Sequence, residues 1–194
     1  MDVKAKTNNF IDIYNEANPE GRFELLMDNY ANVPKEIRKA EKKLQFKIKA
    51  EQEWIRSHSA GELGVRVNSS KLGDPTANEA ISNVMMEEAF ETGNLDKSIL
   101  RGISNTAEYE EEFRLICHIK MDYELLMEIF EGLPDRDAEI MKARFVDGKL
   151  YKVIAIDEGK TIEAIRRKIE KLCRAIKEEI IEYLEMSAEK FSNN

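Results

Sequence analysis

Positively charged side chains gather in one stretch near the C-terminal end of the chain. Between residues 160 and 177, seven cations outnumber two carboxylates, Glu163 and Glu170, and give this stretch a charge of +5. The seven are Lys160, Arg166, Arg167, Lys168, Lys171, Arg174 and Lys177. The whole chain carries −8, so the remainder carries −13. Because a polyanion responds to the local field, this pattern indicates a phosphate-binding surface on an acidic protein.

Residues for catalysis or metal binding show no comparable pattern. Cys117 and Cys173 lie far apart, and His58 and His118 are isolated. Cys117 and His118 are adjacent, but neighbours on a helix point about 100° apart and make a poor chelating pair. Paired acids, Ser–His spacings and glycine-rich phosphate loops do not stand out either. We therefore expect no enzyme activity, no metal, no cofactor, and buried thiols.

The composition predicts an all-α protein. The 194 residues include 42% apolar and 35% charged residues, with only 9 Gly and 4 Pro, a mixture that favours helices over turn-rich folds. No apolar run approaches the roughly 18 residues of a membrane span, and no basic-then-apolar segment opens the chain. We expect a cytoplasmic protein without membrane contact.

The elements before residue 132 are predicted to form a helical, coiled-coil-like region over residues 1–131. Two short helices between residues 8 and 31 are separated by a turn at residues 18–21, and Pro34 opens a long helix over 35–58. Its apolar residues recur at spacings of seven, four and seven, as in a coiled-coil seam. They are Ile37, Leu44, Ile48 and Ile55.

Basic side chains crowd the other faces of the 35–58 helix, which predicts a solvated surface, with phosphate contact as the alternative. Trp54 on this helix is interpreted as a core or inter-helix contact and not as a platform for stacking bases.

Two more helices follow a segment without helical periodicity, residues 59–73, which we interpret as a loop or short hairpin. Thr76 and Glu79 have capping-box spacing and predict a helix over 77–91 that stops near residues 92–94. Residues 104–106 start a long amphipathic helix to residue 131. We expect this helix to pack antiparallel against the 35–58 helix. A homodimer through these long helices is left open by the sequence.

Residues 132–185 are predicted to form a wingless helix-turn-helix. A helix begins near Asp135, residues 147–149 form a turn, and a short helix spans 150–158. Gly159 can adopt the left-handed conformation that ends this helix, and the Thr161 hydroxyl can cap the last helix, from residue 162 to about 184.

The predicted packing turns the cationic side of the last helix outward. Ala155 permits the close approach of the two helices, and Ile154 and Ile165 fill the space between them, with Ile169 and Leu172 extending the buried stripe. Such a helix reads base edges with its N-terminal residues and contacts phosphates with its flanks. The candidate DNA contacts are Lys160, Thr161, Ile162, Glu163, Arg166, Arg167, Lys168 and Lys171, with Tyr151 and Lys152 in a supporting role. A solvated basic face is the alternative.

At these residues the chain resembles region four of bacterial sigma factors. Residues 133–148 resemble its "L-P-x-R-E…R-Y-x-x-G" opening, and residues 149–165 its "L-S-x-x-E-I-A-x-x-L-G-x-S-x-x-T-V" continuation. Ile154 and Ala155 match the Ile-Ala, Gly159 the turn glycine, Thr161 the Ser and Ile165 the Val. The chain departs at Lys149-Leu150 in place of Leu-Ser, Val153 in place of Glu, and Ala164 in place of Thr.

The order of elements, with the segment Gly73-Asp74-Pro75-Thr76, is similar to the ArpU and RinA families of phage and prophage late-gene regulators. This resemblance implies activation of late operons through promoter double-stranded DNA and RNA polymerase. No match to sigma region two, which melts promoters, is present, so a sigma-like activator is expected before a stand-alone sigma factor. The alternatives are a small-terminase-like packaging protein and a module that binds polymerase without DNA.

Overall fold

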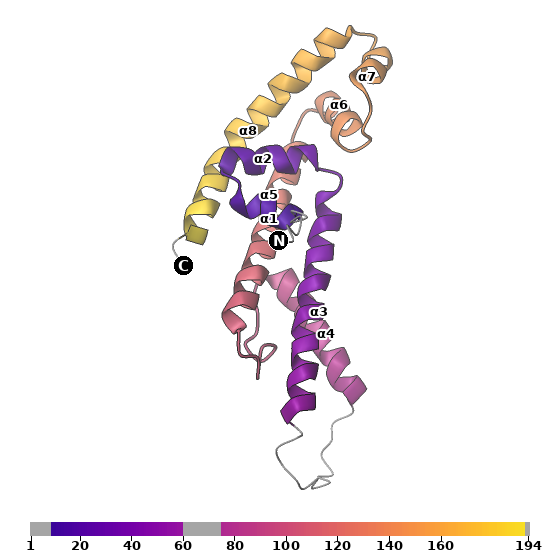
Figure 1. The fold of residues 1–194 in the computed structure, drawn as a ribbon. Helices are drawn as coiled ribbons and strands as arrows, with labels where there is room; N and C mark the ends of the chain where they lie inside the picture. The colour runs from indigo at the N-terminus through magenta and orange to yellow at the C-terminus, as the bar shows by residue number, and fades with distance from the viewer. Residues whose placement is uncertain (1–8, 60–74, 193–194) are drawn as a thin grey trace, which may run out of the picture. The chain divides into compact units, whose positions relative to one another are not determined.

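The computed structural model describes residues 9–59 and 75–192, and the regular elements in these ranges are all α-helices (Figure 1). The all-α prediction is therefore confirmed. The helices are α1 (Phe10–Glu16), α2 (Pro19–Asp28), α3 (Val33–Ser59), α4 (Pro75–Thr92), α5 (Thr106–Glu131), α6 (Asp135–Phe145), α7 (Tyr151–Asp157) and α8 (Ile162–Ser192). Within the described residues, none of these helices is long and apolar enough to cross a membrane.

The chain packs as two compact units. The first contains Met1–Ile37 together with His118–Asn194, and the second contains Arg38–Cys117. Helices α3 and α5 each contribute residues to both units. The predicted domain boundary between residues 131 and 132 lies inside the first unit, and it stays a prediction.

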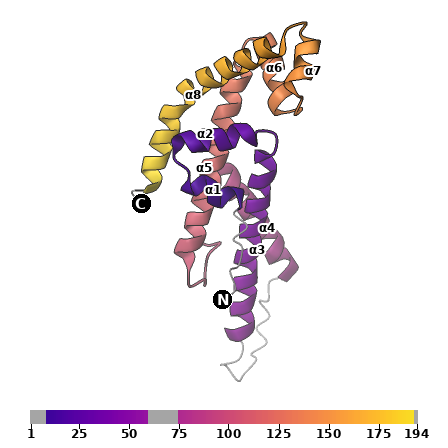
Figure 2. The same cartoon turned by 45° about the horizontal axis from the view of Figure 1, so that its top comes forward.

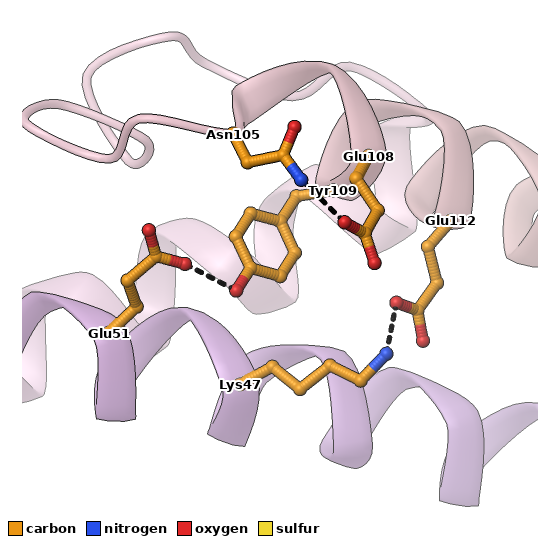
Figure 3. Close-up of polar contacts among 6 residues, drawn as sticks. All are labelled: Lys47, Glu51, Asn105, Glu108, Tyr109 and Glu112. Atoms are coloured by element: carbon orange, nitrogen blue, oxygen red, sulfur yellow. Dashed lines mark hydrogen bonds and ion pairs between the residues drawn. The ribbon is translucent and has the colours of Figure 1, made fainter.

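The second unit contains an antiparallel contact between α3 and α5 (Figure 3). The Lys47 ammonium lies 2.6 Å from the Glu112 carboxylate, and the Tyr109 hydroxyl donates a hydrogen bond of 2.5 Å to Glu51. Going from Lys47 to Glu51 along α3, the partners on α5 go back from Glu112 to Tyr109. The two helices therefore run in opposite directions at this contact, as predicted. The hydrogen bond to Glu51 raises the pKa of Tyr109 to about 12.

Trp54 does not belong to the core of this unit, so its predicted buried role is wrong. Its side chain is 59% exposed and stacks on His58, with the ring centroids 4.2 Å apart. The physical reason is its helical position, because Trp54 follows the buried Ile48 by six residues and lies about 240° around the helix from it.

Several predicted helix ends are confirmed. Pro34 lies in the first turn of α3, and α5 begins at Thr106. Gly93, with a φ of 69°, follows the last residue of α4. Of the loop or hairpin predicted for residues 59–73, Ser59 belongs to the end of α3, and residues 60–73 lie outside the described residues. The side chains of the predicted capping box at Thr76 and Glu79 also lie outside them.

The turn between α1 and α2 is shorter than predicted. Asn18 is the N-cap of α2, and its side chain accepts a hydrogen bond of 2.8 Å from the Gly21 amide. Pro19 occupies the first helical turn, where its missing N–H costs nothing. Residues 19–21, which the sequence suggested as a turn, therefore open the helix.

A buried polar network joins α1, α5 and α8 in the first unit. Asp122, only 6% exposed, accepts hydrogen bonds from the Tyr14 hydroxyl at 2.8 Å and the Ser187 hydroxyl at 3.5 Å. Ser187 also lies 2.8 Å from Nδ1 of His118. Burial raises the pKa of the Asp122 carboxyl above its ordinary value, although these hydrogen bonds oppose the shift. The apolar periodicity of α5 does not indicate this carboxylate.

Candidate nucleic-acid interface

Helices α6, α7 and the first half of α8 contact one another within the first unit. Helix α6 starts after Pro134 and buries Ile140 and Met141. The turn to α7 contains Gly148 at a φ of 65°, and the Lys149 amide donates a hydrogen bond of 2.8 Å to the carbonyl of Ala143. Gly148 therefore allows the reversal that brings α7 back onto α6.

Gly159 ends α7 in the left-handed conformation that the sequence predicts, with a φ of 62°. The Lys160 amide donates to the Ala155 carbonyl at 2.9 Å, and the Gly159 amide donates to the Ile156 carbonyl at 3.2 Å. These two bonds are the Schellman pattern, which satisfies carbonyl groups at a helix end. A β-carbon at this φ would be strained, so glycine is the residue that fits the turn.

Thr161 caps α8 as predicted. Its hydroxyl oxygen accepts a hydrogen bond of 3.2 Å from the amide of Ala164 in the first turn. This bond satisfies one of the amides that a helix start leaves without an intrahelical partner. The cap and the Gly159 turn together fix where α8 begins and in which direction it leaves α7.

The predicted apolar contact between α7 and α8 is confirmed. Ile154 and Ala155 of α7 are 2% and 3% exposed, and Ile165 and Ile169 of α8 are 0% and 2% exposed. Leu172 extends the stripe but is half-buried. Since these side chains fix one side of α8, the opposite side of its first turns faces outward.

Seven of the eight predicted DNA contacts lie exposed at the start of α8. They are Lys160, Thr161, Ile162, Glu163, Arg166, Arg167 and Lys171. Glu163 and Arg167 form an ion pair of 3.0 Å one helical turn apart, with side chains 59% and 77% exposed. An exposed pair of this kind contributes little to stability, so Arg167 can exchange its carboxylate for a phosphate or base at low cost.

Lys168 differs from the other seven. Its side chain is 29% exposed, and its ammonium group forms an ion pair with Asp137 of α6. The contact places Lys168 between helices and away from the exposed face. Its neighbour Arg167 points outward, because consecutive residues are about 100° apart on a helix.

Tyr151 links the outward face to α6. Its ring lies 4.7 Å from the guanidinium carbon of Arg144 and 5.9 Å from that of Arg166, so two cations flank one half-buried aromatic ring. Arg144 also donates a hydrogen bond of 3.3 Å to the Lys149 carbonyl in the preceding turn. A supporting role was predicted for Tyr151, but its link to Arg144 was not. Lys152, its predicted companion, is exposed.

The outward face of α7 is apolar. Leu150, Val153 and Ile156 are 68%, 41% and 71% exposed and recur every third residue. Lys149 and Asp157 flank them with an ion pair of 3.1 Å. This stripe was not predicted, because α7 was expected only to pack against α8 and support it.

Among the described residues, no group of three or more His, Cys, Asp or Glu side chains is placed to hold a metal ion. The arrangement at the start of α8 can instead bind an anion through several cations on a fixed helix. Comparisons of the sequence with models of protein families, with curated proteins and with solved structures found no match.

Proposed function

We propose that this protein binds specific double-stranded DNA through the first turns of α8 and regulates transcription. The observation that carries the proposal is the two-sided character of these turns. Ile165 and Ile169 are buried against the neighbouring helices, while Arg166 and Arg167 are exposed on the other side. An α-helix about 10–12 Å in diameter fits the B-DNA major groove, which is about 12 Å wide.

The exposed side chains suit different parts of a duplex. Ile162, 49% exposed at the helix start, can contact a thymine methyl group, and the Glu163 carboxylate can accept from a cytosine amine. Arg166 and Arg167 can donate to guanine edges or phosphates, and Lys160 and Lys171 to phosphates. Lys168 serves this surface indirectly, by holding α8 to α6.

The regulatory role rests on the resemblance to sigma factor region four. The resemblance includes the residues that set the turn, Gly159 and Thr161, and the residues that pack the helices, Ile154, Ala155 and Ile165. In this role the protein activates phage or prophage late genes, with RNA polymerase as its protein partner.

A second candidate function is a module that binds polymerase or a sigma factor without DNA. The apolar stripe of Leu150, Val153 and Ile156 on α7 favours it, because exposed apolar side chains grouped on one helix face are typical of protein-binding surfaces.

Selection from a pool of random-sequence duplexes tests the proposal and identifies the target site in the same experiment. We expect the full chain to enrich one motif and to bind it with strong salt dependence. Arg166→Ala combined with Arg167→Ala should weaken that binding, by about 1–3 kcal/mol for each interaction with a base that the substitutions remove. For each phosphate interaction removed, the slope of log affinity against log salt should flatten by about one.

The matched control is Arg56→Ala combined with Arg101→Ala, which removes the same charge from two exposed positions elsewhere. The control should keep the selected motif and most of the affinity. Failure to enrich any motif, or equal loss of affinity in both double variants, would contradict the proposal. Polymerase capture without DNA enrichment would favour the second candidate.

A further inference from the structure

Two large apolar side chains are exposed beside the contact between α3 and α4, inside the Arg38–Cys117 unit. Phe46 of α3 is 73% exposed and Val84 of α4 is 61% exposed. The side chain of Gln45 on α3 donates a hydrogen bond of 3.1 Å to the side chain of Asn83 on α4. Phe46 directly follows Gln45 in the sequence, and Val84 directly follows Asn83. Neither residue is required for the surface at the start of α8.

Helical geometry places Phe46 and Val84 on one face. Figures 1 and 2 both show α4 crossing α3 and running in the opposite direction. In two antiparallel right-handed helices, the residue after each contact residue points to the same side of the plane through both axes, since each step turns about 100°. Leu44 and Met86, both buried, lie on the other side of that plane. Phe46 and Val84 therefore point together away from the core of this unit.

The same face carries opposite charges on its two helices. Lys42 lies about one turn before Phe46 on α3, and Glu87 and Glu91 lie about one and two turns after Val84 on α4, all exposed. Because the helices run in opposite directions, these cationic and anionic side chains lie at the same end of the face. The apolar pair lies beside them.

We infer that a second copy of this chain docks on this face, with the four α3 and α4 helices forming a bundle. A two-fold axis that runs along the helices places α3 against α4 of the second copy. This rotation leaves the position of every residue along the axis unchanged. Phe46 then meets the second copy's Val84, and Lys42 meets the second copy's Glu87 and Glu91. Such an interface is self-complementary, because every contact occurs twice.

The charges select this arrangement over the inverted one. A two-fold axis perpendicular to the helices would reverse the second copy end for end. Lys42 would then lie at the opposite end from the second copy's Glu87 and Glu91, and Phe46 and Val84 would be the main remaining contact. The parallel axis alone pairs both the apolar and the charged side chains.

The size of the face predicts a modest affinity. Helix α4 has 18 residues, a length of about 27 Å, and two helices side by side are about 20 Å wide. The face therefore covers about 500 Å² on each copy, or about 1,000 Å² in total, which is below the roughly 1,200 Å² of the smallest stable interfaces and in the range of weak, transient ones. We expect a dimer that forms as the protein concentration rises.

Sedimentation of the full chain from about 1 to 200 µM, a range that brackets micromolar affinity, tests this inference. The natural chain should shift from monomer to dimer, while Phe46→Glu combined with Val84→Glu should stay monomeric with unchanged helical content. Trp54→Glu is the matched control, because Trp54 is also large, apolar and exposed on α3 but points away from α4, about 180° from Gln45. It should dimerise like the natural chain.

Charge reversal distinguishes this arrangement from other contacts. Lys42→Glu alone, and Glu87→Lys combined with Glu91→Lys, should each weaken dimerisation at least tenfold. An equal mixture of the two variants should form heterodimers, measured by native mass spectrometry. A natural chain that remains monomeric throughout, dimers that survive Phe46→Glu and Val84→Glu, or a mixture that forms no heterodimer would overturn the inference. None of these results depends on whether the protein binds DNA.

Discussion

The ammonium group of Lys168 forms an ion pair with the carboxylate of Asp137, and this contact joins α8 to α6. Both side chains are largely covered, with exposed fractions of 29% and 23%. The side chain of the adjacent Arg167 is 77% exposed, and its described ion pair is with Glu163 of the same helix. Two neighbouring cations therefore lie in different surroundings, one between helices and one exposed to solvent.

Lys168→Ala should lower the free energy of unfolding by about 1 kcal/mol, the upper end of the range for ion pairs that retain some solvent contact. Arg167→Ala should change it by less than about 0.5 kcal/mol, as is usual for exposed positions. Urea denaturation measures both. The duplex affinity should show the opposite order, with the larger loss in Arg167→Ala. A stable Lys168→Ala variant with the weaker DNA binding would contradict this division.

Gly159→Ala should destabilise the protein by about 1–2 kcal/mol, the cost of the left-handed conformation for a residue with a β-carbon. The cause is the φ of 62° and not crowding, because an added β-carbon would meet no atom within 4 Å. Thermal or urea unfolding measures the loss. Gly132→Ala is the control, since its β-carbon would lie an ordinary 3.4 Å from the Glu128 carbonyl. Equal losses at the two positions would show that the turn conformation is not the cause.

Asp122 should make stability fall as the pH rises. Burial raises the pKa of its carboxyl in the folded protein above the ordinary 3.8, so the folded state holds this proton more tightly than the unfolded state. Its contribution to stability is full below about pH 4 and is lost as the pH rises through the folded pKa.

Asp122→Asn removes this titration and keeps an oxygen that can accept from the Tyr14 hydroxyl. Urea denaturation at several pH values measures the free energy of unfolding of both proteins. The value for Asp122→Asn minus the value for the natural chain should increase as the pH rises. Asp96→Asn is the comparison, because hydrogen bonds with Ser98 lower the pKa of Asp96. Its stability relative to the natural chain should therefore change in the opposite direction as the pH rises. A difference between Asp122→Asn and the natural chain that stays constant or reverses with pH would contradict the prediction.

Cys173 should react slowly with alkylating reagents. Burial, assisted by Asp28, raises the pKa of its thiol from 9.0 to about 11. Because the thiolate is the nucleophile, its population near pH 8 falls about a hundredfold. Iodoacetamide labelling of a Cys117→Ser variant measures the rate at Cys173 alone. The rate should rise at least tenfold in denaturant, and equal rates in folded and unfolded protein would disprove the shift.

Elements that depend on close neighbours in the chain could be predicted from the sequence. Gly159, Thr161 and Pro34 act within one helical turn of themselves, and each lies in the predicted conformation or helix position. The buried residues Ile154 and Ile165 follow from the same short-range periodicity.

Features that depend on distant partners could not be predicted. Lys168 meets a carboxylate 31 positions earlier, and Asp122 meets Tyr14 across 108 positions. Trp54 is large and apolar, and its hydropathy alone does not indicate that this side of α3 is exposed to solvent. The end of α8 was placed near residue 184, the last buried apolar position described, but the helix continues to Ser192 through residues with no glycine or proline to stop it.

Helix α8 is one uninterrupted element of 31 residues, about 46 Å long. Its first turns carry the exposed arginines, and farther along Lys177 lies 3.1 Å from Glu20 of α2. One continuous helix therefore carries both the exposed arginines and a contact with α2. A change in the direction of α8 where it meets a duplex would also move the residues that contact α2.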